Sequence, residues 1–145
     1  AASDVYKRQA GQRKYWLFVT SPENFEICIQ EGVWGVDRFK NLIQQAGPGD
    51  LAVFYVKKSK KEEPKFVGIF TITSEVYEDE TELWPDKLYP YRVRIKPYRK
   101  YLERPARSVI DKLDFIKNKQ NWGIYLMGVE MKQLSKEQFI KIVEG

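Results

Sequence analysis

The chain has 145 residues, of which 43% are hydrophobic and 14% aromatic, and it carries a formal net charge of +5. This length fits one domain, and the apolar content is sufficient for a packed core and argues against disorder. Histidine is absent, which excludes Ser-His-Asp and Cys-His catalytic arrangements and the usual His-bearing zinc sites, and a lone Cys28 excludes an intramolecular disulfide.

Residues 1–13 are small and polar without periodicity, and we expect them to be a disordered leader outside the domain, which then occupies residues 14–145. No apolar run approaches the roughly 18 residues that cross a bilayer. We therefore expect a cytoplasmic protein without a membrane partner. Walker and GxGxxG loops are also missing, so the sequence predicts neither a cofactor nor a metal site.

The first predicted elements are a strand and a helix. Residues 15–19 form a continuous apolar run, which is typical of a strand buried on both faces. Ser21 can cap the helix that follows, Pro22 suits its first position, and Gly32 suits its end. The inward face of this helix is expected to carry Phe25, Cys28 and Ile29.

The middle of the chain predicts one more helix and a pair of strands. Residues 37–45 have the spacing of a short helix. Residues 51–56 and 66–73 are β-branched and aromatic, and the basic loop 57–65 joins them as a hairpin. Gly68, inside the second strand, predicts a bulge where the sheet bends.

Basic residues gather in the next part of the chain, where residues 87–121 hold eleven basic and three acidic side chains. Residues 91–96 alternate apolar and basic types, which predicts a strand ending at Pro97. Its apolar side chains would face the core, and its basic ones would form a phosphate track on the other face. The core-facing residues are Tyr91, Val93 and Ile95, and the others are Arg92, Arg94 and Lys96.

Two helices and a short strand complete the pattern. Ser108 and Asp111 resemble a capping box for a helix that buries four apolar residues, Ser135 begins a last helix, and residues 128–134 predict a strand. Strands outnumber helices and do not alternate with them regularly. We therefore predict an α+β fold, a small, strongly bent mixed β-barrel flanked by helices.

These segments, taken in order, resemble the EVE domain family, which belongs to the PUA-like superfamily and is related to the YTH domains that read methylated adenine. The resemblance extends from Tyr15 to the C-terminus. The matching segments are Tyr15-Trp16-Leu17-Phe18-Val19-Thr20, Pro22-Glu23-Asn24, Gly32-Val33-Trp34-Gly35-Val36, Pro48-Gly49-Asp50, Gly68-Ile69-Phe70, Trp84-Pro85 and Tyr89-Pro90-Tyr91-Arg92-Val93.

The resemblance implies a pocket that takes up a flipped, modified base in an aromatic cage. Trp34 and Trp84 would be two walls, and Asn24 would contact the base edge. Gly35 would offer its backbone N–H where YTH domains often carry serine. The full set implied for the base is Thr20, Ser21, Asn24, Val33, Trp34, Gly35, Trp84, Leu88 and Tyr89, and the set for phosphates is Arg92, Arg94, Lys117 and Lys119.

Three functions remain open from the sequence. The first is a non-catalytic, monomeric module that binds modified DNA or RNA, with no catalytic residues. The second is an enzyme of RNA or nucleotide metabolism that uses Glu31, Asp37 or Tyr89, and the third is a scaffold whose aromatic surface binds protein. Trp34 can instead be a core residue that plugs the sheet. If it is a pocket wall, we expect Trp34→Ala to abolish binding and leave the fold intact.

Overall fold

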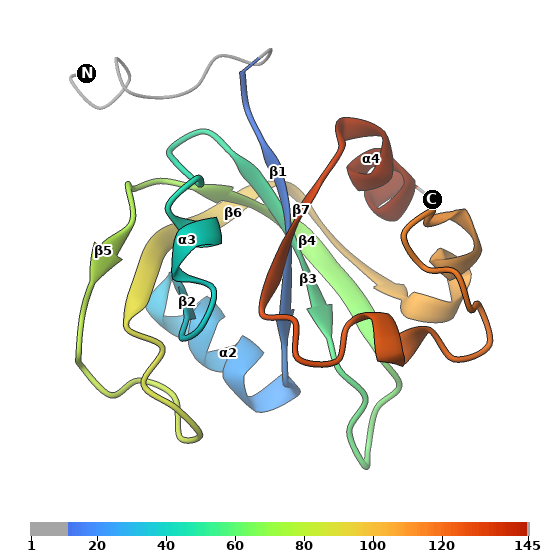
Figure 1. The fold of residues 1–145 in the computed structure, drawn as a ribbon, viewed down its shortest axis with the longest axis horizontal. Helices are drawn as coiled ribbons and strands as arrows, with labels where there is room; N and C mark the ends of the chain where they lie inside the picture. Colours follow the sequence, from blue (N-terminus) through green and yellow to red (C-terminus); the bar gives the residue numbers. More distant parts are fainter. Residues whose placement is uncertain (1–11, 145) are drawn as a thin grey trace.

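The computed structural model describes residues 12–144, in which a curled mixed sheet is flanked by helices (Figure 1). Residues 1–11 of the expected leader lie outside this range. No helix within residues 12–144 is long and apolar enough to cross a membrane. The elements are β1 (Tyr15–Thr20), α2 (Pro22–Glu31), β2 (Val33–Val36), α3 (Lys40–Ile43), β3 (Leu51–Val56), β4 (Lys65–Ile72), β5 (Tyr77–Glu78), β6 (Tyr91–Pro105), η1 (Ala106–Ser108), η2 (Ile110–Lys112), η3 (Trp122–Tyr125), β7 (Met131–Leu134) and α4 (Lys136–Glu144).

The sheet has the strand order β2-β6-β4-β3-β1-β7, and β5 pairs with β6 outside this path. β1 and β3 run parallel in the middle, whereas the other pairs within the described residues are antiparallel. The register of β4 on β6 shifts between Gly68 and Phe70, which confirms the predicted bulge. Because β6 pairs first with β2 and then with β4, the sheet curls into a half-barrel.

The two faces of the sheet bury two apolar clusters. Phe54 and Val56 of β3 belong to the cluster beneath α2, while Val53 and Tyr55 belong to the cluster beneath α4 and the 3₁₀ turns. Successive strand residues point to opposite faces, so a central strand covered on both sides must be apolar throughout. The predicted burial of residues 15–19 on both faces is confirmed for Trp16–Val19, and Tyr15 is partly buried.

A buried carboxylate fixes the turn before β3. Asp50 is fully buried and accepts a hydrogen bond from the Trp16 indole Nε1 at 3.0 Å. The backbone N–H groups of Lys14 and Gly47 donate to the same side chain at 2.8 and 3.1 Å. A buried carboxylate needs such donors. The contacts of Asp50 thus account for the Pro48-Gly49-Asp50 segment, and Trp16 is a core residue.

The first helix forms as its sequence predicts. The Ser21 hydroxyl accepts from the backbone N–H of Asn24 at 3.2 Å, and Gly32 ends the helix in the left-handed region with φ 66°. Cys28 is buried, and burial raises the pKa of its thiol to about 12. The expectation for Ile29 is wrong, because 40% of its surface is exposed. The buried face of α2 is therefore narrower than the helical spacing of its apolar residues predicted.

Several boundaries differ from the prediction, and the predicted strand 128–134 begins only at Met131. β6 does not end at Pro97 but runs on to Pro105, because the proline lies at the bulge, where a missing N–H is tolerated. In place of the predicted helix after Ser108, the chain forms the 3₁₀ turn η2, and the Ser108 hydroxyl donates to the Pro105 carbonyl oxygen at 2.7 Å instead of capping. Only residues 40–43 of the predicted helix 37–45 are helical. The last helix begins after Ser135 as predicted, with the Ser135 hydroxyl accepting from the Gln138 N–H at 3.1 Å.

Candidate functional site

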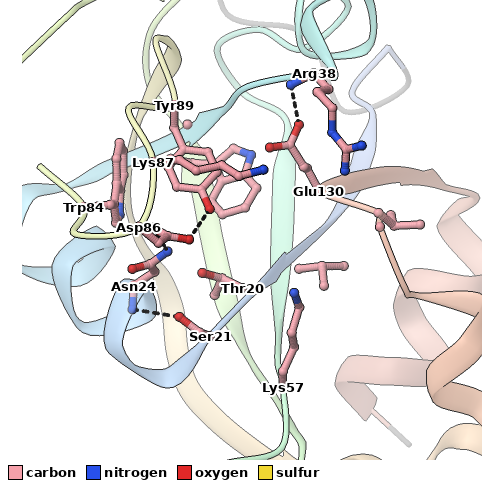
Figure 2. Close-up of a pocket in the computed structure, with 15 residues that line it drawn as sticks. Thr20, Ser21, Asn24, Arg38, Lys57, Trp84, Asp86, Lys87, Tyr89 and Glu130 are labelled. Carbon is pink, nitrogen blue, oxygen red and sulfur yellow. Dashed lines mark hydrogen bonds between the residues drawn. The ribbon is translucent and has the colours of Figure 1, made fainter. Parts of the chain in front are cut away.

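A pocket of about 130 Å³ opens where the end of β1, the start of α2, β2 and the loop before β6 meet (Figure 2). Its walls come from segments that lie far apart in the sequence. The lining residues are Val19, Thr20, Ser21, Asn24, Trp34, Gly35, Arg38, Lys57, Trp84, Asp86, Lys87, Tyr89, Gly128, Val129 and Glu130.

The structure brings seven of the nine residues predicted to contact the base into this pocket. They are Thr20, Ser21, Asn24, Trp34, Gly35, Trp84 and Tyr89. Val33 does not line it, being buried in the cluster beneath α2. Leu88 does not line it either, and its carbonyl oxygen accepts from Arg92 at 3.1 Å. The carboxylates of the enzyme hypothesis, Glu31 and Asp37, also lie outside the lining.

Trp34 is both a core residue and a wall of the pocket. Only 4% of its surface is exposed, and its ring stacks on Phe18 with centroids 4.6 Å apart and planes 9° apart. It also packs edge-on against Phe54 at 5.6 Å. Truncating a ring packed in this way costs about 3–5 kcal/mol of stability. We therefore expect Trp34→Ala to destabilise the fold, in contrast to the expectation from the sequence.

The Trp34 indole N–H is a buried donor with no acceptor among the described residues. Leaving such a donor unpaired costs about 1–3 kcal/mol, and buried polar groups in proteins are normally paired. Trp34 also lines the pocket. An unpaired donor on a pocket wall is a feature of sites that complete their hydrogen bonds with a ligand.

Trp84 lies directly over Gly35. A Cβ at position 35 would lie 2.9 Å from the Tyr89 carbonyl oxygen, closer than real contacts allow, and 3.0 Å from the Trp84 ring, which is tighter than most. Trp84 is 5% exposed, and Tyr89 packs edge-on against it at 5.4 Å. Any side chain at position 35, serine included, therefore requires the loop 79–90 to shift away from β2.

Asp86 is a pocket residue that the sequence analysis missed. Its carboxylate accepts from Asn24 Nδ2 at 2.9 Å and from the Tyr89 hydroxyl at 2.6 Å (Figure 2). Burial acts to raise the pKa of Asp86, but the hydrogen bonds from Tyr89 and Asn24 outweigh it, and the pKa lies below its usual value. Burial and the Asp86 carboxylate raise the pKa of Tyr89. The pocket therefore holds an ionised carboxylate at neutral pH.

Arg92 does not have the role predicted for it. Its side chain is 1% exposed, and its guanidinium donates to the carbonyl oxygens of Tyr89 at 2.9 Å, Leu88 at 3.1 Å and Thr81. It also pairs with Asp79 at 3.4 Å. Strand alternation assigned Arg92 to a solvent face, but the loop 79–90 covers that face. Arg92 therefore holds the loop that carries Trp84, and it is not free to bind a phosphate.

The other predicted phosphate contacts also lie away from the pocket. Lys119 donates to the carbonyl oxygens of Ile110 and Leu113, so its ammonium is engaged by the 3₁₀ turn outside the pocket. Arg94 and Lys117 are exposed but do not line the pocket. The basic residues that do line it are Arg38, Lys57 and Lys87. Lys57 begins the basic loop 57–65, the sequence signal that could have indicated it.

Glu130 forms the opposite wall and fixes the chain around Arg38. Its carboxylate accepts from the backbone N–H groups of Asp37, Arg38 and Phe39 at 2.8 to 3.2 Å. Three consecutive amides on one carboxylate hold Arg38 at the pocket (Figure 2). No group of three or more Asp, Glu, Cys or His side chains in residues 12–144 is placed to hold a metal ion.

The family model described as EVE domain matches residues 14–144. The UPF0310 protein of Pyrococcus abyssi is 40% identical over 140 residues, which cover 90% of this chain and 97% of the relative.

Two solved structures have the same fold. The human THYN1 protein in complex with 5-methylcytosine containing DNA superimposes with a TM-score of 0.58 at 19% identity, covering 87% of this chain and 93% of that chain. The YTH domain of the Zygosaccharomyces rouxii MRB1 protein in complex with N6-methyladenosine RNA gives 0.59 at 13% identity, covering 91% and 85%. These likenesses confirm the predicted PUA-like fold, a strongly bent mixed sheet flanked by helices.

Proposed function

Because the chain belongs to the EVE domain family, we propose that it is a non-catalytic module that binds a modified base of DNA or RNA in the pocket of Trp34 and Trp84. The observation that carries the proposal is the meeting of two indoles, a hydrogen-bonded Asn24–Asp86 pair and a basic rim in one pocket. Two proteins of the same fold were solved with methylated DNA and methylated RNA, which supports this class of ligand.

The energetics of the pocket suit a base that has left its stack. Extrusion costs a few kcal/mol, and stacking on aromatic side chains returns about 1–3 kcal/mol per base. A methyl group enclosed by Trp34 and Trp84 adds about 0.8 kcal/mol. The sum favours selective binding of modest affinity.

The ionised Asp86 indicates which edge of a base the pocket prefers. A carboxylate accepts hydrogen bonds and repels carbonyl oxygens, so it favours a base edge that carries an amino group. Asn24 uses its Nδ2 on Asp86, which leaves its Oδ1 as a second acceptor. We therefore favour an amino-bearing base, of the cytosine or adenine type, over a uracil or thymine type.

The phosphates would be held by the basic rim. Three basic residues of this rim are exposed and line the pocket, namely Arg38, Lys57 and Lys87. Each can therefore contact a phosphate of a bound nucleic-acid strand. Each phosphate contact releases a counterion, so affinity should fall as salt rises.

The test uses fluorescein-labelled 9-mers of single-stranded DNA and RNA, with a central 5-methylcytosine, N6-methyladenine or the unmodified base, and fluorescence polarisation. We expect one modified base to bind at least several-fold more tightly than its unmodified partner in the wild type, and Asp86→Asn to reduce that preference. Lys136→Gln removes a charge on α4, away from the pocket, and serves as the control. Equal affinity for all strands, unchanged by Asp86→Asn, would overturn the proposal.

A further inference from the structure

We propose that a second pocket, built around Trp122, holds the base next to the one in the first pocket, so that one single strand spans both. This inference rests on the proposed function. The second pocket has a volume of about 230 Å³. It is lined by Tyr55, Lys58, Glu63, Pro64, Arg107, Gln120, Asn121, Trp122 and Gly123.

Trp122 is held so that its indole can act as a stacking platform. Its Nε1 donates to the Tyr55 hydroxyl at 3.2 Å, and Tyr55 packs against Phe66 with centroids 5.4 Å apart. The exposed guanidinium of Arg107 lies 5.3 Å from the centre of the Trp122 ring. A half-buried aromatic ring beside a cation is the combination with which proteins bind single strands without reading their sequence.

The two pockets lie at the same end of the sheet, on either side of one strand end. Lys57 lines the first pocket and Lys58 the second, although they are neighbours in the chain. In the parallel pairing of β1 with β3, Val19 lies opposite Tyr55, and these two residues also line different pockets. Figure 1 shows the loop after β3 and the 3₁₀ turn of residues 122–125 at the same end as the start of α2. A strand that crosses the end of β3 would therefore reach both pockets.

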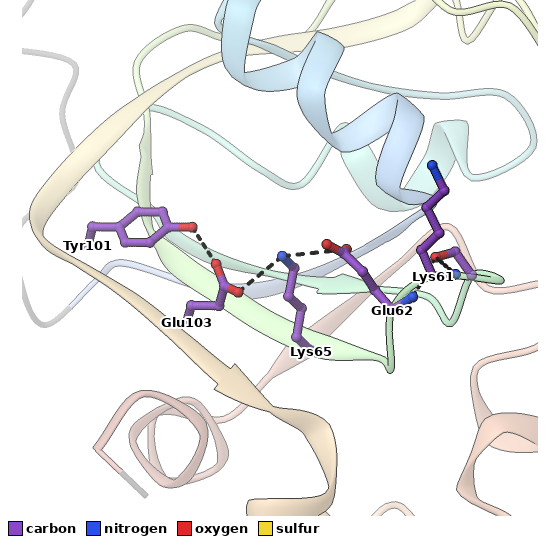
Figure 3. A network of polar contacts seen from close by, with 6 residues as sticks. Lys61, Glu62, Lys65, Tyr101 and Glu103 are labelled. Atoms are coloured by element: carbon purple, nitrogen blue, oxygen red, sulfur yellow. Dashed lines mark hydrogen bonds and ion pairs between the residues drawn. The ribbon is translucent and has the colours of Figure 1, made fainter.

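The loop 57–65 engages one of its carboxylates, Glu62, in a polar network. Glu62 forms an ion pair with Lys65 at 3.8 Å (Figure 3). Lys65 also pairs with Glu103 at 3.1 Å, and the Glu103 carboxylate accepts a hydrogen bond from the Tyr101 hydroxyl. Lys57 and Lys58 lie outside this network, in the two pockets. Both are therefore placed to meet the phosphate that joins two neighbouring nucleotides.

The segment that joins the two pockets exposes two apolar side chains. The segment from Trp122 to Gly128 lines the second pocket at one end and the first at the other. Within it, Ile124 is 48% and Met127 76% exposed. Apolar side chains of this kind contact riboses and base faces in protein–nucleic acid complexes. The Glu63 carboxylate also lines the second pocket, and its negative charge favours a base over a phosphate in that pocket.

The test is an abasic-site scan with single-stranded 9-mers that carry the preferred modified base at the centre. In the wild type, we expect removal of the base at one neighbouring position to weaken binding about 5- to 100-fold, the value of one stacked base. In Trp122→Leu, removal of the same base should weaken binding by less than about twofold, because this variant lacks the ring on which that base would stack. Arg107→Gln with Lys58→Gln leaves the packing of Trp122 on Tyr55 in place and should reduce the same penalty, whereas Lys136→Gln should not.

The outcomes separate the two proposals. If modified strands bind selectively but abasic penalties are identical in wild type and both variants, the second pocket takes no base and this inference falls alone. If the wild type binds no strand selectively, the proposed function falls with it. Circular dichroism melting of each variant shows that it is folded, and should Trp122→Leu not fold, the Arg107 and Lys58 double variant carries the test.

Discussion

The guanidinium of Arg92 lies 5.1 Å from the centre of the Trp84 ring, beneath the loop that carries that indole to the pocket. The same guanidinium donates to three carbonyl oxygens of this loop. Trp84 thus has a cation on one side and the backbone of Gly35 close to its ring edge. A side chain expected to meet phosphates instead positions a wall of the candidate binding site.

Replacement of Arg92 should disturb both stability and the pocket. Arg92→Met leaves the carbonyl oxygens of Thr81, Leu88 and Tyr89 without their donor, and each unpaired buried group costs about 1–3 kcal/mol. We expect the free energy of unfolding in urea to fall by about 3 kcal/mol or more. Arg94→Met changes an exposed residue on the same face of this strand and should alter the free energy of unfolding by about 0.5 kcal/mol or less. Equal losses in the two variants would refute the positioning role.

Trp34 has two properties that different variants can test, the packing of its ring on Phe18 and its unpaired indole N–H. Trp34→Phe keeps a ring against Phe18 and removes the indole N–H, which has no acceptor among the described residues. Trp34→Ala should lower stability by about 3–5 kcal/mol, and Trp34→Phe by clearly less. In the binding assay, Trp34→Phe should still weaken affinity for the modified strand at a temperature where it is fully folded. Wild-type affinity in that variant would show that the indole has no part in binding.

The state of Asp86 predicts how binding depends on pH. Hydrogen bonds from Tyr89 and Asn24 hold its pKa below the usual 3.8 despite burial. A carboxyl with a lowered folded pKa stabilises the fold above its unfolded pKa, and this contribution is lost as pH falls through the folded value. Affinity for an amino-bearing base should therefore be flat from about pH 8 to 5 and fall only below about pH 4. A midpoint near pH 6 in polarisation titrations would contradict the assignment.

Glycine is required at position 35 by the two groups that face it. Gly35→Ala places a Cβ 2.9 Å from the Tyr89 carbonyl oxygen and 3.0 Å from the Trp84 ring. Because backbone must move to relieve this contact, we expect a loss of about 1–3 kcal/mol by urea unfolding and weaker binding. Gly123→Ala is the matched control, since nothing lies within 4 Å of its Cβ position. Similar stability in both variants would mean that the loop yields easily.

Local signals predicted much of the fold. The Ser21 cap, the Gly32 end of α2 and the Ser135 start of α4 depend on neighbours within one helical turn, so the sequence alone contains them. The apolar run 15–19 likewise indicated a strand covered on both faces. The resemblance to the EVE domain family assigns Trp34 and the loop residue Trp84 to one pocket, and both residues line it.

Only the tertiary structure decided what surrounds those indoles. Alternation along residues 91–96 specifies two faces of a strand, but it does not say that a loop will cover the second face and bury Arg92. Asp86 and Glu130 also reach the site through contacts between distant segments. Asp86 accepts from Asn24, 62 positions earlier in the chain, and Glu130 accepts from backbone N–H groups more than 90 positions earlier. Caps and periodicity are set by adjacent residues, whereas the closing of a loop over a sheet depends on packing between segments that the sequence keeps apart.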